Sequence, residues 1–362
     1  MKKFVRVLLV SMLALALVAC GSGDKGQVEG EGKTFEIGVA IYNFDDFMTL
    51  YQEEIKKAFA EAGEKDGNTY NVEVLNAEED PTAQTEQIKN FITKGKDLII
   101  ANLVEPESAS TVINDAKAAD IPVIMINREP SIESMEIWPN KTTYVGVDAT
   151  QSGRFQGDII NNLDDKGDIN GDGVVSYITL MGGLQNVDAI QRTTYSILQL
   201  NDLGIESKDV NGEVYPAEWD TDKAVVATES ALAKYGKDIE VIFANNDGMA
   251  IGAVRALENT GRVVGEDVYV VGVDAIDDAM ELLKNGKLTG TVLNDHYNQA
   301  HTVVEVGIKA MNGEGLSPYY WHDYVLVAEE KDAELKRSDY RTETIEDIKV
   351  RYEERKEIEK GK

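Results

Sequence analysis

Residues 97–127 read DLIIANLVEPESASTVINDAKAADIPVIMIN and contain two apolar runs separated by a helix-like segment. The runs at 97–103 and 122–127 are almost continuously apolar, which is typical of strands buried on both faces of a parallel sheet. The segment between them, 107–119, has the length of a crossover helix. Because such crossovers are right-handed, the unit predicts an α/β fold with helices on both faces of the sheet.

The same alternation of strand and helix continues on both sides of this unit. Further strands are expected at 35–41, 72–75, 143–147, 174–181, 241–244, 268–274 and 290–293. About 325 residues of this pattern are enough for two domains. We therefore expect two doubly wound parallel-sheet domains, with ligand-binding residues at the carboxyl ends of the strands.

The N-terminus has the features of an export signal. A basic start precedes an apolar run at 7–18, which is too short to span a bilayer, and Cys20, the only cysteine, follows. We interpret 1–19 as a lipoprotein signal peptide, Cys20 as the lipidated residue and 20–33 as a flexible tether. The alternative is an ordinary signal peptide with a chance cysteine. The lipoprotein interpretation predicts an extracytoplasmic protein anchored to the outer face of the cell membrane.

The chain carries 36 Lys and Arg against 65 Asp and Glu, a formal net charge of −29. Such a surface repels nucleic acid and anionic lipid head groups. We therefore expect no nucleic-acid partner, and membrane contact through the lipid anchor only. With a single cysteine no intramolecular disulfide can form, so packing or a metal must stabilise the exported domains.

Polar side chains follow several of the expected strands. Asp46, Asn102, Asn246, Asp274 and Asn294 stand at or just after strand ends in both halves of the chain. The alternative for each is a helix N-cap, where Asn and Asp are favoured. Because the carboxyl ends of parallel strands meet at one edge, five such positions favour a shared cleft.

Two aromatic residues, Phe47 and Trp219, stand beside carboxylates in loop-like contexts. Aromatic planes cover the apolar C–H faces of a sugar ring, while Asp, Asn and Arg bind its rim of hydroxyls. Each charge-assisted bond of this kind contributes roughly 1.5–3 kcal/mol. Core packing is the alternative for both aromatic residues.

Residues 168–176, DINGDGVVS, match the first nine positions of an EF-hand calcium loop. Oxygen side chains fall at positions 1, 3, 5 and 9, glycine at position 6, and the carbonyl of Val174 at position 7. Position 12 is Thr179 rather than Glu, so the bidentate carboxylate must come from elsewhere. A polar turn is the alternative.

Along nearly the whole region 35–327 the chain resembles the periplasmic galactose/glucose-binding proteins of bacterial sugar ABC transporters. Eight motifs carry the resemblance: Ile41-Tyr42 with Asp45-Asp46-Phe47, Asn102-Leu103-Val104-Glu105-Pro106, Asn127-Arg128-Glu129-Pro130, Tyr144-Val145-Gly146-Val147-Asp148, Arg192-Thr193-Thr194-Tyr195, Ala244-Asn245-Asn246-Asp247, Gly272-Val273-Asp274-Ala275 and Gly290-Thr291-Val292-Leu293-Asn294-Asp295. The resemblance implies the periplasmic-binding-protein type I fold, in which two α/β lobes joined by three crossings close on a sugar in the cleft between them.

The resemblance also implies roles for individual residues. Phe47 and Trp219 would stack on the two faces of the pyranose, and Asp46 and Asn102 would contact the hydroxyl that differs between glucose and galactose. Asn186 stands where the family usually has His, and would offer different hydrogen-bond donors to the sugar. The other implied contacts are Tyr42, which lines the cleft, and Asp188, Arg192, Asn246, Asp274 and Asn294.

The family carries a structural calcium ion at the loop described above, with a bidentate Glu from a distant strand. Glu240 matches that position, and Ser176 stands where the family often has Gln. The implied Ca²⁺ ligands are Asp168, Asn170, Asp172, Val174, Ser176 and Glu240.

Lobe boundaries follow from the same resemblance. Residues 35–125 with 295–327 are expected to form the N-terminal sugar-binding lobe, and 126–294 with 328–362 the C-terminal lobe that carries the calcium loop. The charged stretch 328–362 extends beyond the resemblance. We expect it to form a solvated helix packed on the second lobe, with partner binding as the alternative.

These features predict a lipid-anchored, monomeric solute-binding protein that delivers D-galactose or D-glucose to an ABC-transporter permease. The resemblance leaves a chemoreceptor open as a further partner. The alternative within the fold is a binder of another solute, such as ribose or a signalling sugar.

An enzyme could use Asp46 and Asp188 as paired carboxylates. Neighbouring Asn and Arg, however, are expected to leave no acid with a raised pKa, so we expect no catalysis. The export signal and the acidic charge argue against a DNA-binding repressor.

Overall fold

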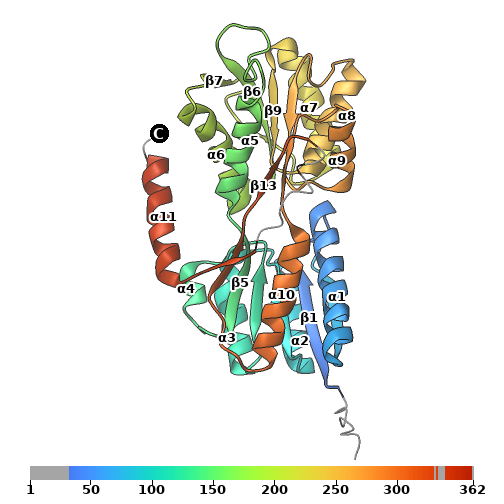
Figure 1. The fold of residues 1–362 in the computed structure, drawn as a ribbon, viewed down its shortest axis with the longest axis vertical. Helices are drawn as coiled ribbons and strands as arrows, with labels where there is room; N and C mark the ends of the chain where they lie inside the picture. Colours follow the sequence, from blue (N-terminus) through green and yellow to red (C-terminus); the bar gives the residue numbers. More distant parts are fainter. Residues whose placement is uncertain (1–31, 330–331, 333–338, 361–362) are drawn as a thin grey trace, which may run out of the picture.

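The computed structural model describes residues 32–329, 332 and 339–360. The predicted signal peptide, Cys20 and most of the predicted tether lie outside these residues. The described part forms two α/β lobes stacked along the long axis of the molecule (Figure 1). The predicted fold class is thereby confirmed. Within the described part, no helix is long and apolar enough to cross a membrane.

The N-terminal lobe is built on a seven-stranded sheet with the order β14-β12-β5-β4-β3-β1-β2. Its strands are β1 (Thr34–Ile41), β2 (Thr69–Asn76), β3 (Leu98–Ala101), β4 (Val123–Ile126), β5 (Thr142–Val147), β12 (Tyr319–His322) and β14 (Arg341–Glu343). All neighbouring strands are parallel except β12 and β14. The helices of this lobe are α1 (Asp46–Asp66), α2 (Pro81–Lys94), η1 (Pro106–Ser108), α3 (Ala109–Ala118), α4 (Ile132–Met135) and α10 (His296–Met311).

The second lobe contains a sheet with the order β10-β9-β6-β7, in which β8 also pairs with β6. Its strands are β6 (Val175–Met181), β7 (Ser207–Asp209), β8 (Tyr215–Pro216), β9 (Val241–Ala244) and β10 (Tyr269–Val271), beside the antiparallel pair β11 (Thr291–Leu293) and β13 (Val325–Val327). The helices are α5 (Ala149–Asn161), α6 (Val187–Asp202), α7 (Thr221–Tyr235), η2 (Gly236–Asp238), α8 (Asp247–Thr260) and α9 (Asp277–Lys284). Strands β3, β4 and β9 are buried along their whole length, which explains their continuous apolar sequences.

Helix N-caps cluster where the strands end. Each cap side chain accepts a backbone N–H from the first turn of its helix, which satisfies one of the helix's free donors. These caps are Asp45 on α1, Asp148 on α5, Asn186 on α6 and Asn246 on α8. The N-cap interpretation of Asn246 is therefore correct. It does not exclude a ligand role, because a capping side chain at this edge also faces the space between the lobes.

Helices α5 and α6 pack closely because two positions on α5 are glycine. A Cβ on Gly153 would lie 2.8 Å from the carbonyl oxygen of Arg192, and one on Gly157 would lie 2.6 Å from the Cβ of Gln199. Real Cβ atoms do not approach other atoms so closely, so a side chain here would push α6 away. The two glycines thus set the position of α6, which carries Asp188 and Arg192 to the cleft.

The lobe boundaries differ from those expected. Strand β5 belongs to the first sheet, so the N-terminal lobe continues to Val147 instead of ending at 125, whereas β13 pairs with β11 in the second lobe. After β13 the chain returns to the N-terminal lobe. There β14 pairs with β12, and Ile348 of α11 (Ile345–Lys360) is fully buried in the core. The charged segment therefore packs on the N-terminal lobe. The C-terminal segment joins this lobe because β12 leaves an open edge with which β14 can pair. A strand of three residues is too short for the sequence to show which sheet it will join.

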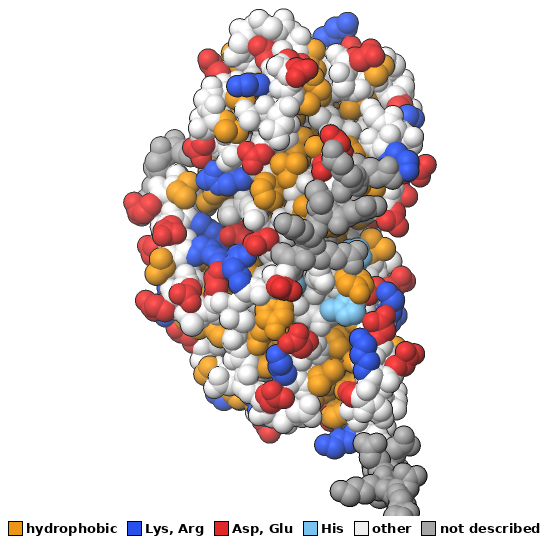
Figure 2. Space-filling view, in the orientation of Figure 1, with side chains coloured by type: hydrophobic (Ala, Val, Ile, Leu, Met, Phe, Trp, Pro, Cys, Tyr) orange, Lys and Arg blue, Asp and Glu red, His pale blue; other side chains and the backbone are white. Residues whose placement is uncertain are grey.

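The surface agrees with the acidic composition. Asp and Glu side chains are spread over both lobes on the face shown in Figure 2. Lys and Arg gather mainly at the left of that face, at the level of the junction between the lobes. Elsewhere on this face, acidic and basic side chains are scattered among uncharged ones.

Candidate functional site

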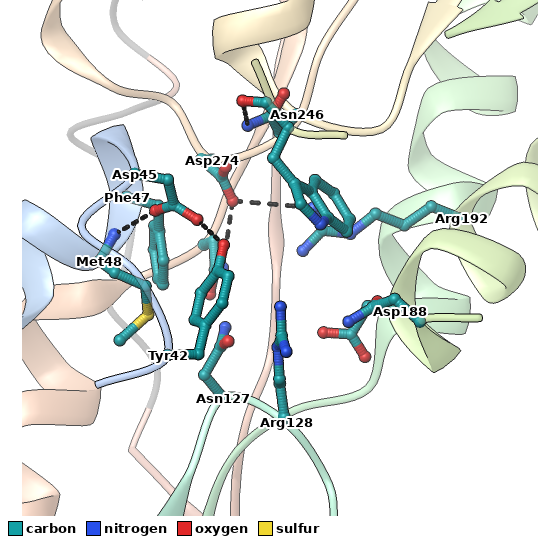
Figure 3. Close-up of a pocket in the computed structure, with 13 residues that line it drawn as sticks. Tyr42, Asp45, Phe47, Met48, Asn127, Arg128, Asp188, Arg192, Asn246 and Asp274 are labelled. Carbon is teal, nitrogen blue, oxygen red and sulfur yellow. Dashed lines mark hydrogen bonds and ion pairs between the residues drawn. The ribbon is translucent and has the colours of Figure 1, made fainter. Parts of the chain in front are cut away.

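A pocket lies between the two lobes and contains about 370 Å³ that protein atoms do not fill, part of it open to solvent. Side chains from both lobes point into it (Figure 3). The N-terminal lobe contributes Tyr42, Asp45, Phe47, Met48, Asn127 and Arg128. The second lobe contributes Asn186, Asp188, Arg192, Trp219, Asn246 and Asp274, and Asn294 stands where the chain crosses between the lobes.

The wall from the N-terminal lobe is a connected set of polar and aromatic groups. Asp45 accepts the backbone N–H of Met48 at 2.7 Å and the hydroxyl of Tyr42. The guanidinium carbon of Arg128 lies 3.6 Å from the centre of the Tyr42 ring, so the two side chains stack. Arg128 also donates to the backbone carbonyl of Val104 at 2.7 Å. These contacts hold Tyr42 and Arg128 in place before any ligand arrives.

Arg192 is the centre of the opposite wall. It is 3% exposed, donates to the carbonyl of Asn245 at 2.6 Å and to the hydroxyl of Tyr324 at 3.0 Å, and lies 3.9 Å from Asp274. Its Nε has no hydrogen-bond partner within the described part of the chain. A buried donor left without a partner is unfavourable, so this N–H is suited to a ligand oxygen.

Trp219 and Asp274 are held in unusual backbone conformations. Trp219 has φ 66° and Asp274 has φ 121°, both in regions that L-residues rarely adopt. The indole of Trp219 lies against Gly182, where a Cβ would come within 2.3 Å of the ring. Asp274 accepts the amide of Asn294 at 3.2 Å, and Asn294 in turn accepts from Gln299 at 2.7 Å. Strain that neighbouring groups maintain in this way is typical of ligand-binding positions.

Burial destabilises the ionised form of three carboxyl groups in the pocket. Burial raises the pKa of Asp45 and Asp188, and raises that of Asp274 well above its ordinary value. Arg192 acts in the opposite direction on Asp188 and Asp274, because its positive charge favours their ionised forms. A neutral ligand that donates several hydrogen bonds would stabilise these carboxylates further. An anionic ligand would meet them as like charges.

The pocket between two such lobes has a counterpart in a known family. The family described as periplasmic binding protein domain matches residues 37–315. The chain belongs to this family.

Individual relatives agree with this assignment. The D-galactose/methyl-galactoside binding periplasmic protein of Haemophilus influenzae is 34% identical over 286 residues, 77% of this chain and 82% of that protein. The ribose import binding protein of Bacillus subtilis is 26% identical over 81% of this chain and 88% of its own length. A solved ABC transporter solute binding protein from Bacillus halodurans with bound myo-inositol is 31% identical, covers 85% of this chain and 98% of its own, and has a TM-score of 0.71. The chain is thus similar to solute-binding proteins, not to enzymes.

Nine of the eleven predicted sugar contacts line the pocket of this periplasmic binding protein: Tyr42, Phe47, Asn186, Asp188, Arg192, Trp219, Asn246, Asp274 and Asn294. Sequence reasoning missed four others, Asp45, Met48, Asn127 and Arg128. Asn127 and Arg128 belong to the quoted Asn-Arg-Glu-Pro motif, which could have identified them.

Asp46 lies outside the pocket, contrary to the prediction. It lines an adjoining open groove with Phe44, Glu79 and Asp220, whose unfilled space is about 890 Å³, open solvent included. In the pocket itself Asp45 stands where Asp46 was expected. The reason is the start of α1, because the capping residue and the first helical residue point in different directions. The expectation that no acid has a raised pKa was also wrong, since burial raises the pKa of both Asp46 and Asp188. With Asp46 outside, the two carboxyls do not form a pair within the pocket.

Asn102 lies behind the pocket wall. It is fully buried, its Oδ1 accepts the backbone N–H of Tyr42 at 3.3 Å, and its Nδ2 donates to Oδ1 of Asn127 at 3.1 Å. Asn102 therefore positions two pocket residues instead of reaching the pocket itself.

The predicted calcium loop packs against β9 through Glu240, which is 1% exposed. Its two carboxylate oxygens accept the backbone N–H groups of Asn170 and Ser176, each at 2.9 Å. Asp168 and Asp172 accept further loop N–H groups. Within the described residues no three Asp, Glu, His or Cys side chains converge as a metal site. The loop still brings together the hard oxygen donors that Ca²⁺ prefers, with Glu240 beside positions 3 and 9.

Proposed function

We propose that this chain is the extracytoplasmic sugar-binding component of an ABC importer and that its ligand is D-galactose or D-glucose. The observation that carries the proposal is the pairing of Phe47 from one lobe with Trp219 from the other around a single pocket rimmed by carboxylate, amide and guanidinium groups. A pyranose has apolar faces for the two rings and hydroxyls for the rim. The relative at 34% identity that binds galactosides supports a hexose.

Binding would favour closure of the two lobes. Each lobe supplies about half of the pocket, so a sugar contacts both halves only when they stand as they do here. A ligand shifts a conformational equilibrium by its difference in affinity for the two states. The closed form would then differ in shape from the empty form, and this difference lets a permease distinguish them.

A cyclitol is the second candidate. The solved relative at 31% identity holds myo-inositol, which is a neutral ring of hydroxyls like a pyranose. Asn186 lines the pocket and contributes an amide there. The carboxylates that suit sugar hydroxyls would serve a cyclitol equally, so only binding data separate the two ligands.

Calorimetric titration of residues 21–362 with galactose, glucose, myo-inositol and ribose tests the proposal. Galactose or glucose is expected to bind most tightly. At a hundredfold excess over its dissociation constant it should stabilise the fold by about 2.7 kcal/mol. Tight binding of myo-inositol with neither hexose bound would replace the hexose by a cyclitol. Failure of all four to bind would refute sugar binding.

We further propose that Ca²⁺ binds the 168–176 loop with Glu240 and stabilises the second lobe. The support is the set of oxygen donors at positions 1, 3, 5 and 9 and the buried carboxylate beside them. A bound ion would stabilise the junction between the loop and β9 without touching the sugar pocket. Chelation is expected to lower the melting temperature and leave sugar affinity nearly unchanged. An equal melting temperature with and without chelator would contradict the site.

Lipidation of Cys20 is the proposed means of attachment to the membrane. The support is its position after a short apolar segment in a chain with no other cysteine. Incorporation of an alkyne-labelled fatty acid into the wild type, and its absence from Cys20→Ser, would be the expected result. The permease and a chemoreceptor are the proposed partners of the closed form, and co-purification with and without sugar tests both.

A further inference from the structure

The C-terminal segment 339–360, which contains β14 and α11, lies beyond the residues 37–315 that match the family. In Figure 1, α11 starts beside α4 of the N-terminal lobe and runs along the side of the molecule past the junction between the lobes. Its start is firmly held. β14 pairs with β12, Ile348 is fully buried, and Thr344 and Asp347 cap the helix reciprocally.

The second half of α11 reaches across to the other lobe. Arg351 and Arg355 stand four residues apart and so share one face of the helix. Arg355 Nη2 lies 2.7 Å from Oδ1 of Asp148, and Arg351 Nη1 lies 3.7 Å from its Oδ2. Asp148 directly follows β5, at the first crossing between the lobes, and caps α5 by accepting the backbone N–H of Thr150 at 3.0 Å. A helix anchored on the N-terminal lobe thus holds the first residue of the second lobe.

This ion pair is shielded from water. Arg355 is 9% exposed. Burial alone raises the pKa of Asp148, but the charge of Arg355, the Thr150 hydrogen bond and Arg351 outweigh it and lower the pKa below its ordinary value. Removing one partner of such a pair leaves an uncompensated buried charge, which is strongly unfavourable.

The charge of the pair also reaches groups at the ligand pocket. The charge of Arg355 acts on Glu129, which follows the pocket residue Arg128, and on Asp188, which lines the pocket. One cation supplied by the C-terminal helix therefore faces acidic groups from both lobes, close to the place where the chain first crosses between them.

We propose that α11 is a clasp and that Arg355 is a positioning residue, which holds the second lobe through Asp148 in the arrangement that completes the pocket. The clasp raises the fraction of molecules with a complete pocket before ligand binds. Apparent affinity falls in proportion to that fraction, so a tenfold loss of closed molecules weakens sugar binding tenfold. Only the affinity part of this inference rests on the proposed sugar-binding function.

Distance measurement between the lobes tests the clasp without any ligand. With Cys20 removed, the chain has no cysteine, so spin labels can be placed at the exposed positions 89 on α2 and 226 on α7. Pulsed electron resonance is expected to give a larger share of long distances for Arg355→Ala than for the wild type. Lys356→Ala is the matched control and should match the wild type, because Lys356 stands next to Arg355 but is 57% exposed and pairs with Glu353 on its own helix.

Two conservative variants keep the test valid if Arg355→Ala folds poorly. Arg355→Lys retains the charge and should recover most of the closed population. Asp148→Asn retains the capping oxygen but loses the charge, and should open the lobes as Arg355→Ala does, with no further opening in the double variant.

Galactose titration of the same variants supplies the second readout. At least tenfold weaker binding is expected for Arg355→Ala and unchanged binding for Lys356→Ala. Distance distributions that are identical in wild type and Arg355→Ala would overturn the clasp. If the wild type binds no sugar while Arg355→Ala still opens the lobes, the proposed function fails and the clasp stands.

Discussion

Glu129 allows a pH-dependent test of the charged groups around Arg355 of α11. Burial raises the pKa of its carboxyl to about 7, although Arg355 and a hydrogen bond with Tyr352 act in the opposite direction. In the unfolded chain the pKa is near 4.3. Below the unfolded value the group is protonated in both states and has no effect. As pH rises from there through 7, the folded state resists ionisation and loses stability relative to the unfolded chain.

The size of the effect follows from the two pKa values. Each pH unit between them is worth about 1.4 kcal/mol, which sets an upper limit of about 3–4 kcal/mol. Oε1 of the carboxyl is buried, but the residue as a whole is half-buried and solvent screens part of the effect, so we expect about 1–2 kcal/mol. Glu129→Gln carries a permanently neutral amide of the same shape. It should therefore stabilise the protein by about 1–2 kcal/mol at pH 8 and have little effect at pH 4.5.

Urea unfolding at the two pH values measures this difference directly. Glu354→Gln, on the exposed side of α11, is the matched control and should show no such change with pH. A Glu129→Gln variant that is less stable than the wild type at pH 8 would refute the reasoning. It would show that the ionised carboxylate is a net stabilising partner of Arg355.

Three further predictions concern the pocket, the loop and the helix pair. Trp219→Ala should weaken sugar binding by roughly 30-fold or more, about 2 kcal/mol, with an unchanged melting temperature; titration that finds wild-type affinity would exclude stacking. Asp172→Asn keeps the oxygen that accepts the Val174 N–H but loses the charge, so its melting temperature should fall in Ca²⁺ and match the wild type in chelator; an equal fall in both would count against the metal. Gly157→Ala should destabilise the fold by about 1–3 kcal/mol in urea unfolding, because its Cβ would meet Gln199; wild-type stability would show that α6 moves freely.

Much of the second wall of the pocket could be predicted from the sequence. Asn246 and Asp274 lie two and three residues beyond the ends of β9 and β10, and Asn294 directly follows β11, which isolated parallel bridges align with the segment after β10, so all three come to one edge. The sequence could not show which of two adjacent aspartates lines the pocket. Asp45 and Asp46 are the same residue type and both follow the first strand. Asp45 caps α1 and faces the pocket, whereas the turn of the helix directs Asp46 to the groove outside.

The sequence by itself determined the α/β class, the two lobes and most of the polar groups at their junction, because apolar runs and strand-end residues are local signals. Only the tertiary structure decided where β14 and α11 lie, and with them the contact between Arg355 and Asp148. That contact joins residues far apart in the chain. The contact depends on which edge of the first sheet is open to β14 and on the length of α11, which starts just after β14. The sequence around Arg355 and Asp148 indicates neither of these.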